Sequence, residues 1–111
     1  MPAEWEEHRS TWLAWPKNPD TFPKGVIEPV ESNYVRIIEV FATGENVNVL
    51  VDDKGMEKRI LEMIGKRNNI FFHHIKTMDV WIRDYGPIFI KNNDQVAATK
   101  WIFNSWGNKY A

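Results

Sequence analysis

Short apolar runs alternate with longer amphipathic stretches through the first two thirds of the chain, and this alternation limits the fold more than any other feature. We expect strands at Ser10–Trp15, Val47–Val51 and Asn69–Ile75, because short apolar runs bounded by turn residues are typical of buried strands. Helical stretches of about a dozen residues separate them. Strands joined in this way usually pair in parallel through βαβ units, so the sequence predicts an α/β fold.

The two helical stretches are marked by their ends and by their apolar spacing. The first begins at Glu28 with Pro29 in its first turn, and the second follows Asp52 or Asp53, either of which can cap it. Gly44 and Gly65 are expected to end the two helices. Apolar residues recur at three- and four-residue steps, at Val30, Tyr34, Ile37, Ile38 and Phe41 in the first helix and at Met56, Ile60, Leu61 and Ile64 in the second.

The last third of the chain predicts a β-hairpin. A strand at Pro87–Lys91 is followed by a tight turn at Asn92–Asp94, and Gln95–Phe103 returns antiparallel to it. The whole order is then β-α-β-α-β-β-β, which predicts one mixed sheet with helices.

Composition narrows the class of protein. A chain of 111 residues forms one domain at most. Its formal net charge of -1 gives no indication of a nucleic-acid or anionic-membrane partner. The absence of cysteine excludes disulfides, thiolate metal sites and thiol catalysis within these residues. No apolar run approaches the roughly 18 residues of a membrane span, and a cytoplasmic location is the default expectation.

The stretch Thr77–Phe89 places two carboxylates, an arginine and a tryptophan directly before a Gly-Pro turn. Asp79 and Asp84 are five residues apart, which suits neither one face of a strand nor one face of a helix. The pair Gly86–Pro87 favours an irregular segment, with Asp84 at a bend at the mouth of the hairpin.

A carboxylate beside an indole face suits a planar cation. The carboxylate of Asp84 can accept paired hydrogen bonds from a guanidinium, and the ring of Trp81 would add a cation–π attraction of about 0.5–2 kcal/mol. The alternative is purely structural: Arg83 pairs with one of the two aspartates, and Trp81 belongs to the core.

The histidines give little sign of a metal site. His73 and His74 are adjacent on an expected strand and so point to opposite faces. His8 lies among three glutamates, where a solvated turn is the simpler interpretation. We expect no metal and no cofactor.

Three aromatic segments, at residues 1–16, 79–87 and 101–110, together resemble the N-terminal part of the agmatine deiminase family, which includes bacterial-type peptidylarginine deiminases. The resemblance implies an incomplete pentein-type fold covering roughly the first third of the family's usual chain. It also implies hydrolysis of a guanidinium C–N bond without a metal, agmatine being converted to N-carbamoylputrescine and ammonia in putrescine and polyamine synthesis.

By this resemblance, Asp84 matches a substrate-binding carboxylate and Trp81 an aromatic residue lining the pocket. Asp79, Arg83, Gly86 and Pro87 match the scaffold of the motif. The family's nucleophilic Cys, its catalytic His and its second guanidinium carboxylate belong to later modules, so we expect this chain alone to be inactive.

Other functions remain open from the sequence. The chain could derive from a peptidylarginine or arginine deiminase, or could be a non-catalytic guanidinium- or polyamine-binding domain. The aromatic end, Lys100–Ala111, is rich in large side chains that favour burial. It either folds back or requires a covering partner, and self-association into a homo-oligomer through this surface is a third hypothesis.

Overall fold

The computed structural model describes residues 3, 5–93 and 95–109 of the chain. Their contacts group into two compact units, His8–Val80 and Met1–Glu7 with Trp81–Ala111. The boundary falls inside the Thr77–Phe89 motif, between its first and second aspartates.

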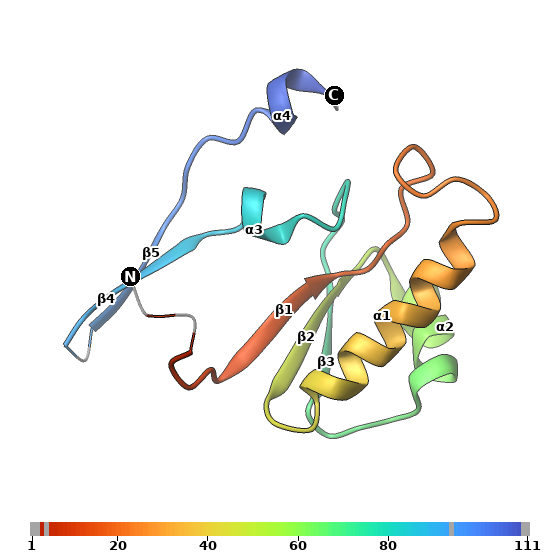
Figure 1. The fold of residues 1–111 in the computed structure, drawn as a ribbon, viewed down its shortest axis with the longest axis horizontal. Helices are drawn as coiled ribbons and strands as arrows, with labels where there is room; N and C mark the ends of the chain where they lie inside the picture. Colours follow the sequence, from red (N-terminus) through yellow and green to blue (C-terminus); the bar gives the residue numbers. More distant parts are fainter. Residues whose placement is uncertain (1–2, 4, 94, 110–111) are drawn as a thin grey trace. The chain divides into compact units, whose positions relative to one another are not determined.

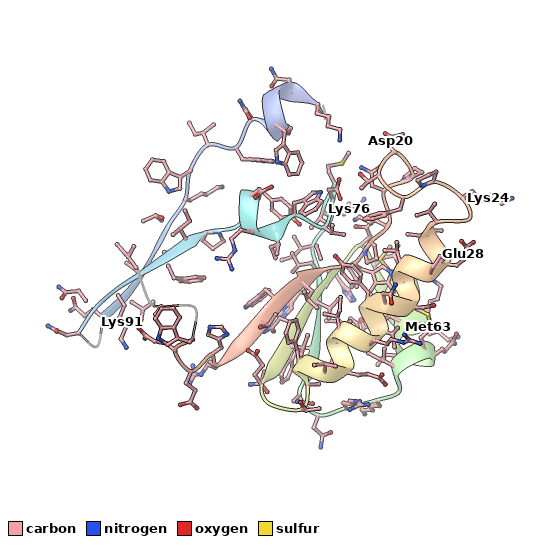
Figure 2. The ribbon with its side chains drawn as sticks, in the orientation of Figure 1. Asp20, Lys24, Glu28, Met63, Lys76 and Lys91 are labelled. Atoms are coloured by element: carbon pink, nitrogen blue, oxygen red, sulfur yellow. The ribbon has the colours of Figure 1, made fainter. Side chains whose placement is uncertain are left out.

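The unit His8–Val80 is a parallel three-stranded sheet covered by two helices. It contains β1 (Ser10–Ala14), α1 (Ile27–Phe41), β2 (Asn46–Val51), α2 (Lys54–Ile64) and β3 (Ile70–His74). The strands lie in the order β1-β2-β3, and both pairings are parallel. Both helices lie on one side of this sheet (Figure 1). Figure 2 shows Glu28 in the first turn of α1 and Lys24 in the loop before it, both at the right of the view. The expected βαβ units are therefore confirmed.

The helix ends agree with the sequence at three of four points. Pro29 lies in the first turn of α1. Asp53, not Asp52, caps α2 by accepting a hydrogen bond from the Met56 N–H at 2.9 Å, and Gly65 ends that helix. The prediction that Gly44 caps α1 is wrong, because the helix ends at Phe41 and its C-cap is Ala42, whose N–H donates to the Ile38 carbonyl.

The core lies between the helices and the sheet, and Trp15 is its largest side chain. Alternate residues of β2 face the helices, since successive strand residues point to opposite sides. Trp15 is 1% exposed. Each large apolar side chain buried in this way stabilises the fold by about 1.5–3 kcal/mol. The buried cluster consists of Trp15, Ile38, Val47, Val49, Val51, Ile60, Ile64 and Ile70.

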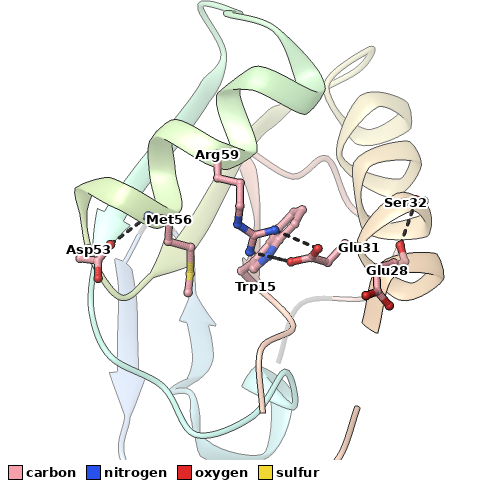
Figure 3. A network of polar contacts seen from close by, with 7 residues as sticks. All are labelled: Trp15, Glu28, Glu31, Ser32, Asp53, Met56 and Arg59. Atoms are coloured by element: carbon pink, nitrogen blue, oxygen red, sulfur yellow. Dashed lines mark hydrogen bonds and ion pairs between the residues drawn. The ribbon is translucent and has the colours of Figure 1, made fainter. Parts of the chain in front are cut away.

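A polar network closes the core beside Trp15 (Figure 3). The indole N–H of Trp15 donates to Oε1 of Glu31 on α1 at 2.9 Å, and Arg59 on α2 donates to Oε2 at 2.9 Å. Burial alone would raise the pKa of Glu31, but the hydrogen bonds from Arg59 and Trp15 and the positive charge of Arg59 outweigh it and lower the pKa. One carboxylate thus links the residue after β1 to both helices.

The two adjacent histidines point to opposite faces of the sheet, as predicted. On the face away from the helices, the His73 ring stacks on Trp12, with centroids 4.7 Å apart, and its Nε2 lies 2.8 Å from Oδ1 of Asn48. His74 instead approaches Glu57 on α2, with Nε2 2.6 Å from Oε2. Both rings therefore have polar partners within the fold.

The second unit contains the hairpin and two short helical turns. Its elements are α3 (Ile82–Tyr85), β4 (Ile88–Asn92), β5 (Gln95–Thr99) and α4 (Ser105–Asn108). The strands β4 and β5 pair antiparallel, which confirms the hairpin, although β5 ends at Thr99 and not at Phe103. Asp94 of the expected turn lies outside the described residues.

The prediction of one mixed sheet is wrong. Within the described part of the chain, β1-β2-β3 form one sheet and β4-β5 a separate one. The segment between β3 and β4 contains polar residues, the helical turn α3 and Pro87, which has no backbone N–H to donate. Such a segment interrupts pairing along the chain. Among the described residues, none of the helices is long and apolar enough to span a membrane.

We expect Glu31→Gln to lower the free energy of unfolding by roughly 1 kcal/mol at pH 7. The substitution removes the negative charge of the carboxylate that accepts hydrogen bonds from Arg59 and Trp15. The folded chain holds the Glu31 pKa below its usual value of 4.5. The stabilisation is therefore present above that pH and is lost as the pH falls through the folded-state pKa. Urea unfolding of the wild-type chain and of Glu31→Gln, at pH 7 and at pH 3–4 (roughly one unit below the usual pKa), measures this loss of stabilisation.

Glu39→Gln is the matched control on the same helix. Glu39 pairs with Arg67 at 3.3 Å, but both side chains are about two-fifths exposed, so its substitution should have little effect. Equal losses for both variants, or a Glu31→Gln loss that does not shrink in acid, would contradict the proposed role of the network.

Candidate guanidinium site

The first half of the motif is attached at the carboxyl edge of the parallel sheet, where the loops after β1 and β3 emerge. Asp79, in the loop after β3, is only 4% exposed. Its Oδ2 accepts a hydrogen bond from the Thr21 hydroxyl at 2.6 Å, and its Oδ1 accepts one from the Val80 N–H at 2.7 Å. Buried carboxylates need such donors. Asp79 therefore joins the two loops.

The buried charge of Asp79 also affects a neighbouring phenol. Burial raises the pKa of Tyr34 on α1, and the negative charge of Asp79 raises it further. Tyr34 packs against the core, with its ring 6.0 Å from Trp15 in an edge-on arrangement. The Tyr34 phenol thus provides an internal reporter of the charge on Asp79.

The second half of the motif forms α3, a single helical turn that begins directly after Trp81. The Asp84 N–H donates to the Trp81 carbonyl at 3.0 Å, so the turn fixes the backbones of these two residues relative to each other. The Asp84 side chain is exposed. The Trp81 side chain is 55% exposed, so the alternative that it belongs to the core is wrong. The two predicted substrate-binding residues are thus both open to solvent.

Gly86 is required by the close packing of this turn. Its N–H donates to the Ile82 carbonyl at 2.8 Å, and a Cβ at this position would lie 2.4 Å from that same oxygen. Pro87 then starts the extended segment that leads into β4. Arg83 lies in α3 and is exposed. Gly86 therefore shapes the turn that carries Asp84.

One residue that the sequence analysis left without a role contacts the predicted site. The indole N–H of Trp106 donates to Oδ2 of Asp84 at 3.0 Å. Phe103 packs edge-on against Trp106, with centroids 4.8 Å apart, and lies 6.2 Å from the ring of Tyr85. Part of the aromatic end therefore folds back onto α3, as one of the two expectations had it. Trp101 and Ile102 remain 72% and 102% exposed. Sequence spacing gave no signal for this contact, since 22 residues separate the partners.

The arrangement suits recognition of a cation. It offers an exposed carboxylate on a short turn, with an exposed indole at the start of the same turn. A carboxylate has about four acceptor positions, so Asp84 can accept from Trp106 and still accept from a ligand. No group of three or more metal-binding side chains gathers anywhere in the described ranges.

We expect Asp79→Asn to lower the pKa of Tyr34 towards its usual value, because the substitution removes a negative charge while the burial of the phenol remains. Titration of the Tyr34 ring by NMR, with ¹³C-labelled tyrosine, measures this shift. The exposed Asp20 on the loop after β1 provides the control: Asp20→Asn should leave the Tyr34 titration unchanged. An unchanged Tyr34 titration in Asp79→Asn would show that Asp79 carries no charge in the folded chain.

Known proteins resemble this chain over all or nearly all of its length. Residues 1–111 match the family model described as Porphyromonas-type peptidyl-arginine deiminase. An agmatine deiminase of Ectopseudomonas mendocina is 35% identical over 108 residues, and one of Pseudomonas aeruginosa is 34% identical over the same length. The solved structure of a substituted C. jejuni agmatine deiminase with substrate bound is 26% identical, with a TM-score of 0.79 over 97% of this chain.

The match covers only part of each relative. The chain spans 28% of the length of each of the two deiminases and 31% of the solved structure. The whole-length family match and the structural similarity nevertheless agree with each other. This chain belongs to the Porphyromonas-type peptidyl-arginine deiminase family, whose relatives include agmatine deiminases.

Proposed function

We propose that this chain supplies one guanidinium-binding wall of an agmatine deiminase-type hydrolase. Asp84 accepts paired hydrogen bonds from the planar cation, and Trp81 lies beside it. The observation that supports this is the exposure of both side chains on one helical turn whose backbone hydrogen bond fixes their spacing. A guanidinium matches the fork geometry of a carboxylate and also stacks on aromatic rings.

Two arguments support a guanidinium compound as the substrate: the carboxylate of Asp84 and the relatives that this chain resembles. Two agmatine deiminases align with nearly all of this chain, and a third was solved with substrate bound. Agmatine carries a guanidinium at one end, which is the group that Asp84 would recognise. We take agmatine as the substrate and peptidyl- or free arginine as the alternative, since all three present the same guanidinium.

The chain by itself should bind agmatine without hydrolysing it. Deimination in the family's manner requires a thiolate nucleophile, and the sequence contains no cysteine. Asp79, the other carboxylate of the motif, is buried and already accepts from Thr21 and Val80. The chemical step would therefore use groups that these residues do not supply, and the same absence favours a non-catalytic guanidinium-binding domain as the second candidate.

We expect agmatine to bind this chain weakly, with Kd on the order of 1 mM or higher, because one exposed carboxylate and one indole supply the contacts. Chemical-shift titration by NMR measures it, and the indole resonance of Trp81 should shift with the ligand. Asp84→Asn should abolish the saturable shift by removing the charge. Putrescine should bind more weakly than agmatine, since an ammonium lacks the planar fork.

Glu28→Gln is the matched control for loss of one exposed carboxylate, since Glu28 lies on α1 in the other unit. It should leave the agmatine titration unchanged. Equal affinity of the wild-type chain and Asp84→Asn for agmatine would exclude Asp84 as the recognition group.

We expect no ammonia release when the purified chain is incubated with agmatine, because no thiolate is present to attack the guanidinium carbon. A coupled ammonia assay against a buffer blank tests this. Turnover above the blank that disappears in Asp84→Asn would show that the chain catalyses the reaction by another route, and would overturn the proposal of a binding wall without chemistry.

A further inference from the structure

The segment that reaches Asp84 adopts an unusual backbone conformation. Ser105, Trp106, Gly107 and Asn108 all have positive φ, at 53°, 54°, 78° and 64°. Only glycine adopts this region freely, and a bulky residue such as tryptophan is a genuine outlier there. Strained residues of this kind persist where surrounding contacts fix them, and they cluster at functional sites.

Local hydrogen bonds hold this left-handed turn in place. The Asn104 side chain accepts from the Gly107 N–H at 3.1 Å, and the Asn104 carbonyl accepts from the Asn108 N–H at 2.6 Å. The Lys109 N–H donates to the Ser105 carbonyl at 2.9 Å. These bonds fix the direction in which the Trp106 side chain leaves the backbone.

Two independent contacts then join the turn to α3. The first is polar, from the Trp106 indole N–H to Oδ2 of Asp84 at 3.0 Å. The second is aromatic, because Phe103 packs against both Trp106 and Tyr85, and Tyr85 is the residue after Asp84. An indole has a single N–H donor, and here it is directed at the predicted substrate carboxylate.

We infer that Trp106 is a positioning residue for Asp84, an inference that rests on the proposed function. Its N–H holds one carboxylate oxygen, and the remaining acceptor positions stay available to a guanidinium. An exposed aspartate without such a partner samples several rotamers, and ordering it on binding weakens affinity. The left-handed turn places the Trp106 indole against the Asp84 carboxylate.

The test separates the contribution of the Trp106 hydrogen bond from the contribution of aromatic packing. Trp106→Phe keeps an aromatic side chain against Phe103 but has no N–H. We expect it to weaken agmatine binding by roughly three- to tenfold, with an unchanged melting temperature. Trp101→Phe is the matched control, since Trp101 is 72% exposed, and it should bind agmatine as the wild-type chain does. Wild-type affinity in Trp106→Phe would overturn the inference.

A second measurement needs no ligand and so distinguishes failure of this inference from failure of the proposed function. In the free wild-type chain, the indole N–H proton of Trp106 should exchange slowly with water, as followed through its ¹H–¹⁵N resonance. Asp84→Ala should speed that exchange and shift this resonance, while the indole resonance of Trp101 stays in place. A Trp106 resonance that does not respond to Asp84→Ala would overturn the positioning role, whether or not agmatine binds.

Discussion

The fold of residues 8–80 depends on burying Trp15 without losing the hydrogen bond of its indole N–H. Trp15 follows β1 directly and is 1% exposed, so an unpaired N–H there would be costly. Glu31 on α1 accepts from it, and Arg59 on α2 pairs with the same carboxylate. The arrangement fixes both helices on one face of the sheet, and the loop that carries Asp79 leaves from the carboxyl edge of that sheet.

The two aspartates of the motif have opposite environments, and this contrast supports the different roles proposed for them. Asp79 is 4% exposed and accepts from Thr21 and from the backbone, so its charge serves the fold. Asp84 is exposed, and the indole N–H of Trp106 approaches only one of its oxygens. A carboxylate that already satisfies buried donors cannot readily exchange them for a ligand, whereas an exposed one can.

Much of this could be predicted from the sequence because it depends on local patterns. The apolar spacing in residues 28–41 and 54–64 gave both helices, and the β-branched run at 47–51 gave the central strand. The sequence also narrowed the cap of α2 to Asp52 or Asp53, because capping by a side-chain oxygen near the helix start is a local feature, and the structure selects Asp53. The Gly44 prediction failed because a glycine near a helix end does not define its last hydrogen bond.

The features that were missed depend on contacts between distant residues or on backbone strain. The hairpin forms a sheet of its own, apart from β1-β2-β3, and residue periodicity does not encode which strands share a sheet. The role of Trp106 depends on four consecutive residues with positive φ, three of which are not glycine. Propensity favours other conformations for them. The turn is held by the hydrogen bonds that Asn104 and Ser105 accept within it and by the contact between Trp106 and Asp84. A site can thus be supported by the residues that local propensity describes least well.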